Sequence, residues 1–207
     1  MPTRRASLAA FTALSLSAAS GLLAGCQPTG GSSAGGRFKG IDLAGLDYAR
    51  RLDLTDPEGR RRSLAEFKGK VLVVFFGYTQ CPDVCPTTLA ELAAVRQQLG
   101  PDGARVQGIF VTVDPERDTS EVLRHYVGSF GSDFVALRGT LEETQAVAKE
   151  FKVFFAKAQG KTEGAYTVDH TAGSYLFDAQ GRVRVFSRYG AGAEALVHDL
   201  KLLLQEG

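Results

Sequence analysis

Hydrophobic positions along this chain follow two spacings, one typical of buried strands and one typical of helices. Residues 71–76 (VLVVFF) are continuously apolar between two glycines, as in a strand buried on both faces of a sheet, and 106–113 predict a second such strand. Residues 77–86 predict a loop. Helical spacing predicts three helices. The first carries Leu89, Leu92, Val95 and Leu99 and ends at Gly100-Pro101, the second covers 119–130 and the third covers 141–151. A short strand over 134–137 is expected between the second and third helices.

The C-terminal part of the chain changes to a hairpin pattern. Residues 174–178 and 182–187 predict two strands joined by a tight turn, and a final helix is expected over 193–204. Upstream, 48–54 and the turn at 56–59 predict a smaller hairpin. This order predicts an α/β fold of the thioredoxin-like class: a central sheet of parallel strands plus an antiparallel hairpin, flanked by helices, with an N-terminal hairpin extension and an insertion between the second strand and the third helix.

The N-terminus has the composition of a targeting segment. Two arginines precede a mostly apolar stretch that is short for a membrane span, which predicts a secretory signal peptide over 1–25. The segment ends in Leu-Ala-Gly before Cys26, which resembles the lipobox where bacterial lipoproteins are cut and lipidated; the alternative is an uncleaved anchor with an incidental Cys26. Residues 26–37 are then a lipidated cysteine and a flexible Gly/Ser tether, and 38–207 form one domain.

The charge balance and the number of cysteines limit the classes of function that this chain can have. The 24 Lys and Arg nearly balance the 23 Asp and Glu, so nothing favours nucleic acid as a partner. Of three cysteines, Cys26 is assigned to the anchor, which leaves Cys81 and Cys85 in the exported domain. A disulfide between residues this close constrains little chain. Redox exchange or metal binding therefore explains the pair better.

Three loops are expected to meet at one edge of the sheet. Sites in open α/β sheets form beyond the carboxyl ends of the parallel strands, where the first strand delivers Cys81 and Cys85 and the second delivers Asp114. His170 lies just before the strand that begins near Ser174. If that strand is antiparallel to the first two, its start falls at the same edge. The sequence therefore predicts that Cys81, Cys85 and His170 converge.

Such a trio has a specific chemistry. Two thiolates and one imidazole suit copper in particular and zinc less selectively. A structural zinc site normally has four protein ligands, and a fourth is not obvious here. Met1 is the single methionine, which argues against a methionine-rich copper site. Pro86 suits the first turn of the following helix, whose N-terminus is expected to lower the pKa of Cys85.

The segments around these residues resemble a known family. Residues 77–87 (GYTQCPDVCPT) resemble the signature of the Sco/SenC family, 113–119 (VDPERDT) its second motif and 166–171 (YTVDHT) its third. The match extends from about Phe38 to the C-terminus and departs at Ser120, where proline would be expected.

This resemblance implies a copper chaperone with a thioredoxin fold. Such a protein helps to load the dinuclear copper centre of cytochrome c oxidase, with Cys81, Cys85 and His170 as copper ligands. Asp83 and Asp114 are candidates for residues that lie next to the ligands and influence the charge of the site without binding the metal. The implied partners are the copper-accepting oxidase subunit, an upstream copper donor, a thiol reductant, and the membrane through the lipid anchor. The expected location is the bacterial cell envelope, facing the periplasm or extracytoplasmic space.

Two enzyme classes are alternatives. A thiol–disulfide reductase acting on envelope cysteines, including those of the oxidase subunit, resembles C-x-x-C with an opposing proline; this chain has C-x-x-x-C, and 169–171 (DHT) contain no proline. A peroxidase needs Thr or Ser three residues before its cysteine, whereas Thr79 lies two residues before Cys81. Copper delivery is therefore favoured, and Cys81 and Cys85 form a redox-active pair under either of the first two functions.

Replacement of Cys26 tests the anchor. Cys26→Ser is expected to release the protein from membranes or leave it unprocessed, because the lipidated sulfur is lost. Membrane fractionation and the mass of the mature N-terminus measure this. A mature chain that starts elsewhere and carries no lipid contradicts the lipoprotein prediction.

Overall fold

The computed structural model describes residues 36–160 and 165–207. The predicted signal peptide, Cys26 and the part of the predicted tether before residue 36 lie outside the described residues. No helix in the described residues is both long enough and apolar enough to cross a membrane.

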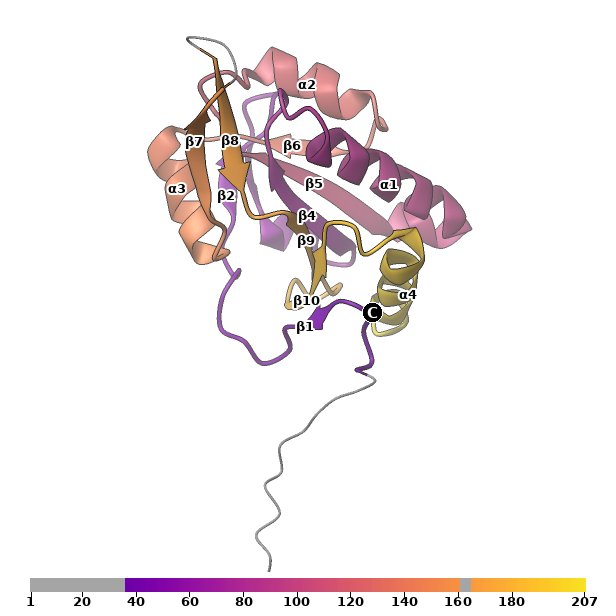
Figure 1. Ribbon diagram of the computed structural model, residues 1–207. Coiled ribbons are helices and arrows are strands. Elements are labelled where there is room, and N and C mark those ends of the chain that lie inside the picture. Colours follow the sequence, from indigo (N-terminus) through magenta and orange to yellow (C-terminus); the bar gives the residue numbers. More distant parts are fainter. Residues whose placement is uncertain (1–35, 161–164) are drawn as a thin grey trace, which may run out of the picture. The chain divides into compact units, whose positions relative to one another are not determined.

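A mixed sheet of six strands forms the centre of the domain (Figure 1). Its spatial order is β1 (Ile41–Asp42), β10 (Val183–Arg188), β9 (Gly173–Phe177), β4 (Val71–Gly77), β5 (Val106–Thr112) and β6 (Val135–Leu137). β4, β5 and β6 are parallel, whereas β9 is antiparallel to both β4 and β10. The predicted α/β class, with parallel strands extended by an antiparallel hairpin, is confirmed.

Helices cover both faces of this sheet. They are α1 (Val84–Gln98), α2 (Ser120–Gly128), α3 (Leu141–Glu150) and α4 (Ala193–Gln205), with the short 3-10 helices η1 (Leu64–Phe67) and η2 (Gly100–Arg105). Successive side chains of β4 point to opposite faces. Phe75 lies beside the sulfur of Cys85 on α1, while the ring of Phe76 packs 5.1 Å from that of Phe151, which follows α3. The continuous apolar run therefore reflects burial on both faces.

Two smaller sheets flank the central one. β2 (Asp53–Thr55) and β3 (Arg61–Ser63) form the predicted N-terminal hairpin, although its first strand begins at residue 53 rather than 48. β7 (Phe155–Gln159) and β8 (Tyr166–His170) form a second hairpin between α3 and β9. The predicted insertion after β5 is present as α2 and β6, but the sequence pattern does not predict β1 or the β7–β8 hairpin.

The start of α1 differs from the prediction. The helix begins at Val84, inside the expected loop 77–86, so Cys85 is a helical residue. Pro86 then occupies the third helical position, where its missing N–H still has no intrahelical partner to lose.

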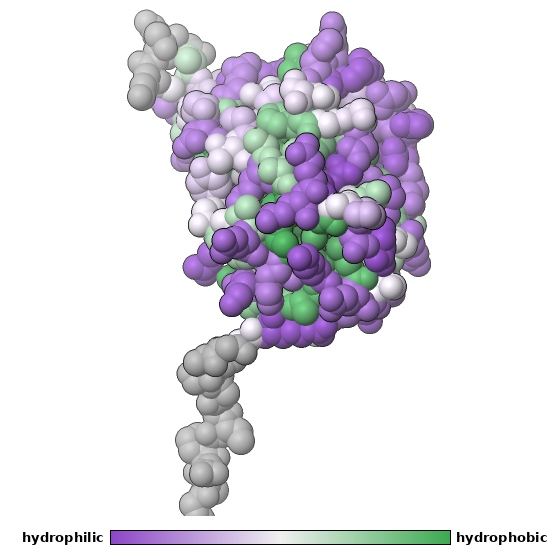
Figure 2. All heavy atoms as spheres, turned by 90° about the vertical axis from the view of Figure 1, so that its right-hand side faces the viewer, coloured by the Kyte–Doolittle hydropathy of each residue, from purple (hydrophilic) through white to green (hydrophobic). Residues whose placement is uncertain are grey.

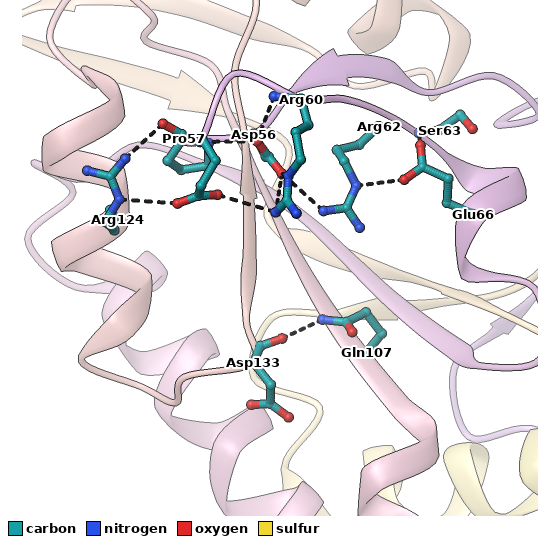
Figure 3. A network of polar contacts seen from close by, with 10 residues as sticks. Asp56, Pro57, Arg60, Arg62, Ser63, Glu66, Gln107, Arg124 and Asp133 are labelled. Atoms are coloured by element: carbon teal, nitrogen blue, oxygen red, sulfur yellow. Dashed lines mark hydrogen bonds and ion pairs between the residues drawn. The ribbon is translucent and has the colours of Figure 1, made fainter.

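The arginines at 60–62 form ion pairs with neighbouring acids. Arg60 and Arg62 both bind the carboxylate of Asp56, which is 1% exposed, and Arg62 also pairs with Glu66 (Figure 3). Burial alone would raise the pKa of Asp56, but the hydrogen bonds from Arg60 and Arg62 outweigh it and hold the pKa below its usual value. This cluster braces the N-terminal hairpin and is not a free basic patch.

A buried carboxylate fixes the N-terminal segment to the last helix. Asp199 of α4 is 1% exposed and accepts the backbone N–H groups of Lys39 and Gly40 at 2.7 and 2.8 Å. A Cβ on Gly40 would meet Val185 at 2.5 Å, so this close approach requires glycine. The segment then continues into β1, which pairs with β10.

The face that carries α1 and α4 has apolar atoms in its middle, among polar side chains (Figure 2). A small groove between these helices is lined by residues that include Leu92, Tyr189 and Leu196. The N–H of Tyr189 donates to the carbonyl of Ala172 at 3.4 Å. This bond joins the groove residue Tyr189 to the short connection between β8 and β9.

Candidate metal centre

The loop over residues 78–83, here called the cysteine loop, carries Cys81 and starts where β4 ends. β4 runs to Gly77, the Cys81 N–H donates to the Tyr78 carbonyl at 3.2 Å, and α1 begins three residues after Cys81. Cys85 is fully buried, whereas Cys81 is half-buried. Gly77 makes room for the deeper sulfur, because a Cβ there would lie 2.7 Å from Sγ of Cys85. The two thiols thus have unequal access to solvent.

His170 ends β8 and faces the sulfurs. Its Nε2 lies 3.7 Å from Sγ of Cys85, and Nδ1 lies 3.0 Å from the carbonyl oxygen of Thr171. A carbonyl only accepts hydrogen bonds, so Nδ1 carries the proton and Nε2 presents its lone pair to the sulfurs. The rings of Phe75 and Tyr78 pack edge-on against the imidazole, with centroids 6.1 and 6.0 Å away. These contacts fix both the tautomer and the orientation of the ring.

The three side chains form one cluster. Sγ of Cys81, Sγ of Cys85 and a ring nitrogen of His170 all lie within 4.8 Å of one another. Within residues 36–160 and 165–207, no other three His, Cys, Asp or Glu groups come this close. In a planar three-coordinate site with bonds of about 2.0–2.3 Å, the ligand atoms lie roughly 3.5–4 Å apart. The predicted convergence is confirmed, and two sulfurs with one imidazole nitrogen are donors that suit a soft ion.

Burial sets the protonation of the metal-free site. It raises the pKa of the Cys85 thiol above its usual value, with a backbone hydrogen bond from Tyr78 opposing it in part. Our expectation that the helix N-terminus lowers this pKa is therefore wrong, because desolvation outweighs it. Burial lowers the pKa of His170, so its imidazole is neutral at neutral pH. The metal-free site thus holds a neutral imidazole and a protonated Cys85.

The two predicted acids occupy different places. Asp83 is exposed at the start of α1, and its carboxylate accepts a hydrogen bond from the Thr87 hydroxyl at 3.3 Å. Asp114 is 2% exposed; it accepts the Tyr166 hydroxyl at 2.9 Å and pairs with Arg117. Asp114 is thus connected to the strand that ends in His170, whereas Asp83 faces its own helix.

Sequence reasoning overlooks a second buried acid beside the cysteine loop. Asp118 is completely buried and accepts the hydroxyls of Thr79 and Thr112, both at 2.5 Å. Burial raises the pKa of Asp118, while the hydrogen bonds from Thr112 and Thr79 oppose the rise. This carboxylate ties the segment before Cys81 to the end of β5. Asp118 belongs to the second family motif, residues 113–119, and this position is the sequence signal that could have identified it.

The fold and the site together define a class: an α/β protein of thioredoxin-like topology with a half-buried Cys-Cys-His centre for a soft metal. A model of the family described as SCO1/SenC matches residues 43–205. The chain therefore belongs to the SCO1/SenC family.

Known relatives agree with this assignment. The SCO2-like protein of Rickettsia felis is 35% identical over 131 residues, which are 63% of this chain and 64% of that protein. The chain thus spans slightly less than two thirds of this relative. The apo Sco1 structure from Thermus thermophilus is 38% identical with a TM-score of 0.71, over 80% of this chain and 96% of that one. Copper-bound ScoI from Bradyrhizobium japonicum is 39% identical with a TM-score of 0.66, over 74% and 97%.

Gly77→Ala tests the packing of Cys85. The added methyl group would lie 2.7 Å from the Cys85 sulfur and 2.9 Å from the Phe75 ring. We expect destabilisation by about 1–3 kcal/mol and displacement of the sulfur. Thermal unfolding and the rate of Cys85 alkylation measure these effects in the reduced, metal-free chain.

Gly128→Ala is the matched control. A Cβ at Gly128, the last residue of α2, meets nothing within 4 Å. It should leave stability and alkylation close to those of the parent. Equal behaviour of the two variants contradicts the packing argument.

Proposed function

We propose that this chain is a copper-binding metallochaperone of the cell envelope that helps to deliver copper to the dinuclear centre of cytochrome c oxidase. The observation that carries this proposal is the Cys81–Cys85–His170 cluster in a chain of the SCO1/SenC family. The copper-bound relative from Bradyrhizobium japonicum supports copper as the metal. Two sulfurs and an imidazole are a soft donor set that suits this ion.

The geometry favours an ion that is held and then passed on. Three ligands leave copper short of a closed four-ligand shell, so an incoming ligand has a position to occupy. Cys81 is half-buried while Cys85 is fully buried. We infer that the partner approaches the metal from the side of Cys81, and that the ion leaves Cys85 last.

The partners and location follow from the same proposal. The acceptor is the copper-binding subunit of the oxidase, and an upstream donor supplies the ion. Lipidated Cys26 anchors the chain to the envelope membrane, on its periplasmic or extracytoplasmic side. A thiol reductant is required because an 81–85 disulfide has no thiolate for copper, and an oxidising envelope favours that disulfide.

Thiol–disulfide reduction is the second candidate, and the free thiols of Cys81 and Cys85 favour it. A reductase needs a thiolate as its nucleophile. Burial raises the pKa of Cys85, which disfavours this residue as the group that first attacks the substrate. Cys81 would then attack the substrate disulfide, and Cys85 would resolve the mixed disulfide. The same two residues thus serve both candidates.

Ligand replacement tests the site. Cys81→Ser and Cys85→Ser should each weaken copper binding, and His170→Ala should weaken Cu(II) binding, by more than about 100-fold, because even an outer partner of a ligand contributes 10–100-fold. His170→Ala should affect Cu(II) most, since imidazole matters most to that ion. Affinity should also fall as pH drops, because protons compete for the sulfurs. Competition titrations and absorption spectra measure these changes.

An exposed histidine provides the control. His125→Ala, on α2, should bind copper as the parent does. A parent-like copper spectrum in His170→Ala would show that the third ligand is another residue.

A transfer experiment separates delivery from reduction. The reduced full-length chain, copper-loaded or metal-free, is mixed with an oxidase copper subunit whose cysteines are reduced or disulfide-bonded. For a chaperone, the loaded chain should metallate the reduced subunit, and the metal-free chain should leave the disulfide intact. Copper spectra and thiol counts are the measurements. Reduction by the metal-free chain without any metal transfer would establish the reductase instead.

A further inference from the structure

The hairpin that carries His170 is separate from the central sheet. β7 and β8 form a sheet of their own, whereas both cysteines follow β4. The distance between the imidazole and the sulfurs therefore depends on the contacts that hold this hairpin against the body of the domain. Figure 1 shows the hairpin standing beside the sheet rather than within it.

Arg117 lies where three segments meet. Its Nη1 donates to the backbone carbonyl of Tyr166 on β8 at 2.9 Å and to Oε1 of Gln80, next to Cys81, at 3.1 Å. Its Nε donates to Asp114, which follows β5. One guanidinium thus links the His170 strand, the cysteine loop and the β5–α2 connection.

Tyr166 is held from several directions. The guanidinium carbon of Arg117 lies 3.6 Å from the centre of the Tyr166 ring, and Nζ of Lys157 lies 4.6 Å from it. The Tyr166 hydroxyl donates to Asp114 at 2.9 Å, and Lys157 also pairs with Glu116 at 2.6 Å. Both strands of the hairpin are therefore attached to the same segment, residues 114–117.

The charges make Arg117 the central element of these contacts. Asp114 is 2% exposed, so its carboxylate needs a cation beside it. Only a planar guanidinium can stack on a ring while donating to several acceptors in its plane. A lysine would keep the charge but lose this combination.

We propose that Arg117, with Asp114 and Tyr166, is a positioning clamp that holds His170 opposite Cys81 and Cys85. Loosening the clamp moves the histidine away from the sulfurs while both cysteines keep their places. In terms of the proposed function, on which this part rests, the clamp sets whether a bound copper ion has three protein ligands or two. A variant without the clamp therefore keeps a two-sulfur site for Cu(I) and loses the imidazole that Cu(II) requires.

Two variants test the clamp without removing a ligand. Arg117→Lys keeps the charge, and Tyr166→Phe keeps the stacked ring while losing the bond to Asp114. Arg124→Lys is the matched control, since Arg124 is an exposed, ion-paired arginine on the nearby α2. Each variant is made in the full-length chain.

Hydrogen exchange of the metal-free chain is the first readout. Amides of β7 and β8 should exchange roughly tenfold faster in Arg117→Lys and less markedly faster in Tyr166→Phe, while β4 and β5 are unchanged. After copper loading, the nitrogen signal in the Cu(II) electron paramagnetic resonance spectrum should weaken in both variants. Cu(I) affinity should change less than about threefold, because the sulfurs are intact.

Several results would overturn the clamp. Parent-like exchange in β7 and β8 for both variants shows that other contacts hold the hairpin. Equal acceleration in β4 and β5 shows that Arg117 stabilises the whole fold rather than positioning His170. Because exchange is measured without metal, it decides for or against the clamp even if the parent chain binds no copper and the proposed function fails.

Discussion

The antiparallel pairing of β9 with β4 is the constraint on which the site depends. In this register Ser174 lies opposite Phe75, two residues before β4 ends at Gly77. The residues just before β9 must then emerge at the edge where β4 delivers its loop. His170 is therefore brought to Cys81 and Cys85 by sheet topology, and a shift of one residue would also turn β9's side chains to the wrong face.

A strand or helix can be predicted from sequence where burial of its side chains follows a regular pattern along the chain. The sequence predicts β4 because Phe75 and Phe76 are both buried, and strand direction predicts that the cysteines and His170 reach the same edge of the sheet. The β7–β8 hairpin cannot be predicted from the hydrophobic pattern, because Val168 is the only buried residue within its two strands. Single side chains such as Arg117 hold it, and their partners are distant in sequence. The pKa of Cys85 is missed for a related reason, since a helix start is visible in the sequence and burial is not.

The metal-free centre combines low charge with soft donors. A protonated Cys85 and a neutral His170 cost little to bury, whereas a thiolate without a cation would cost several kcal/mol. Metal binding must therefore displace a proton from Cys85, which only an ion with strong affinity for sulfur does readily. Burial of this cysteine thus disfavours hard ions such as Mg²⁺ and Ca²⁺, whose preferred ligands are oxygen atoms.

The attachment of the N-terminal segment has a mechanical consequence. Tension applied through the chain before residue 36 enters the fold at Lys39 and Gly40, which are held by Asp199, and then at the two-residue strand β1. β1 lies at the outer edge of the sheet, and β10 and β9 separate it from β4. A pull along this segment first separates β1 from β10 and then β10 from β9. β4, the strand that leads into Cys81, would therefore bear the load only after β1, β10 and β9 have separated, so the cysteines are shielded from tension on the N-terminal segment.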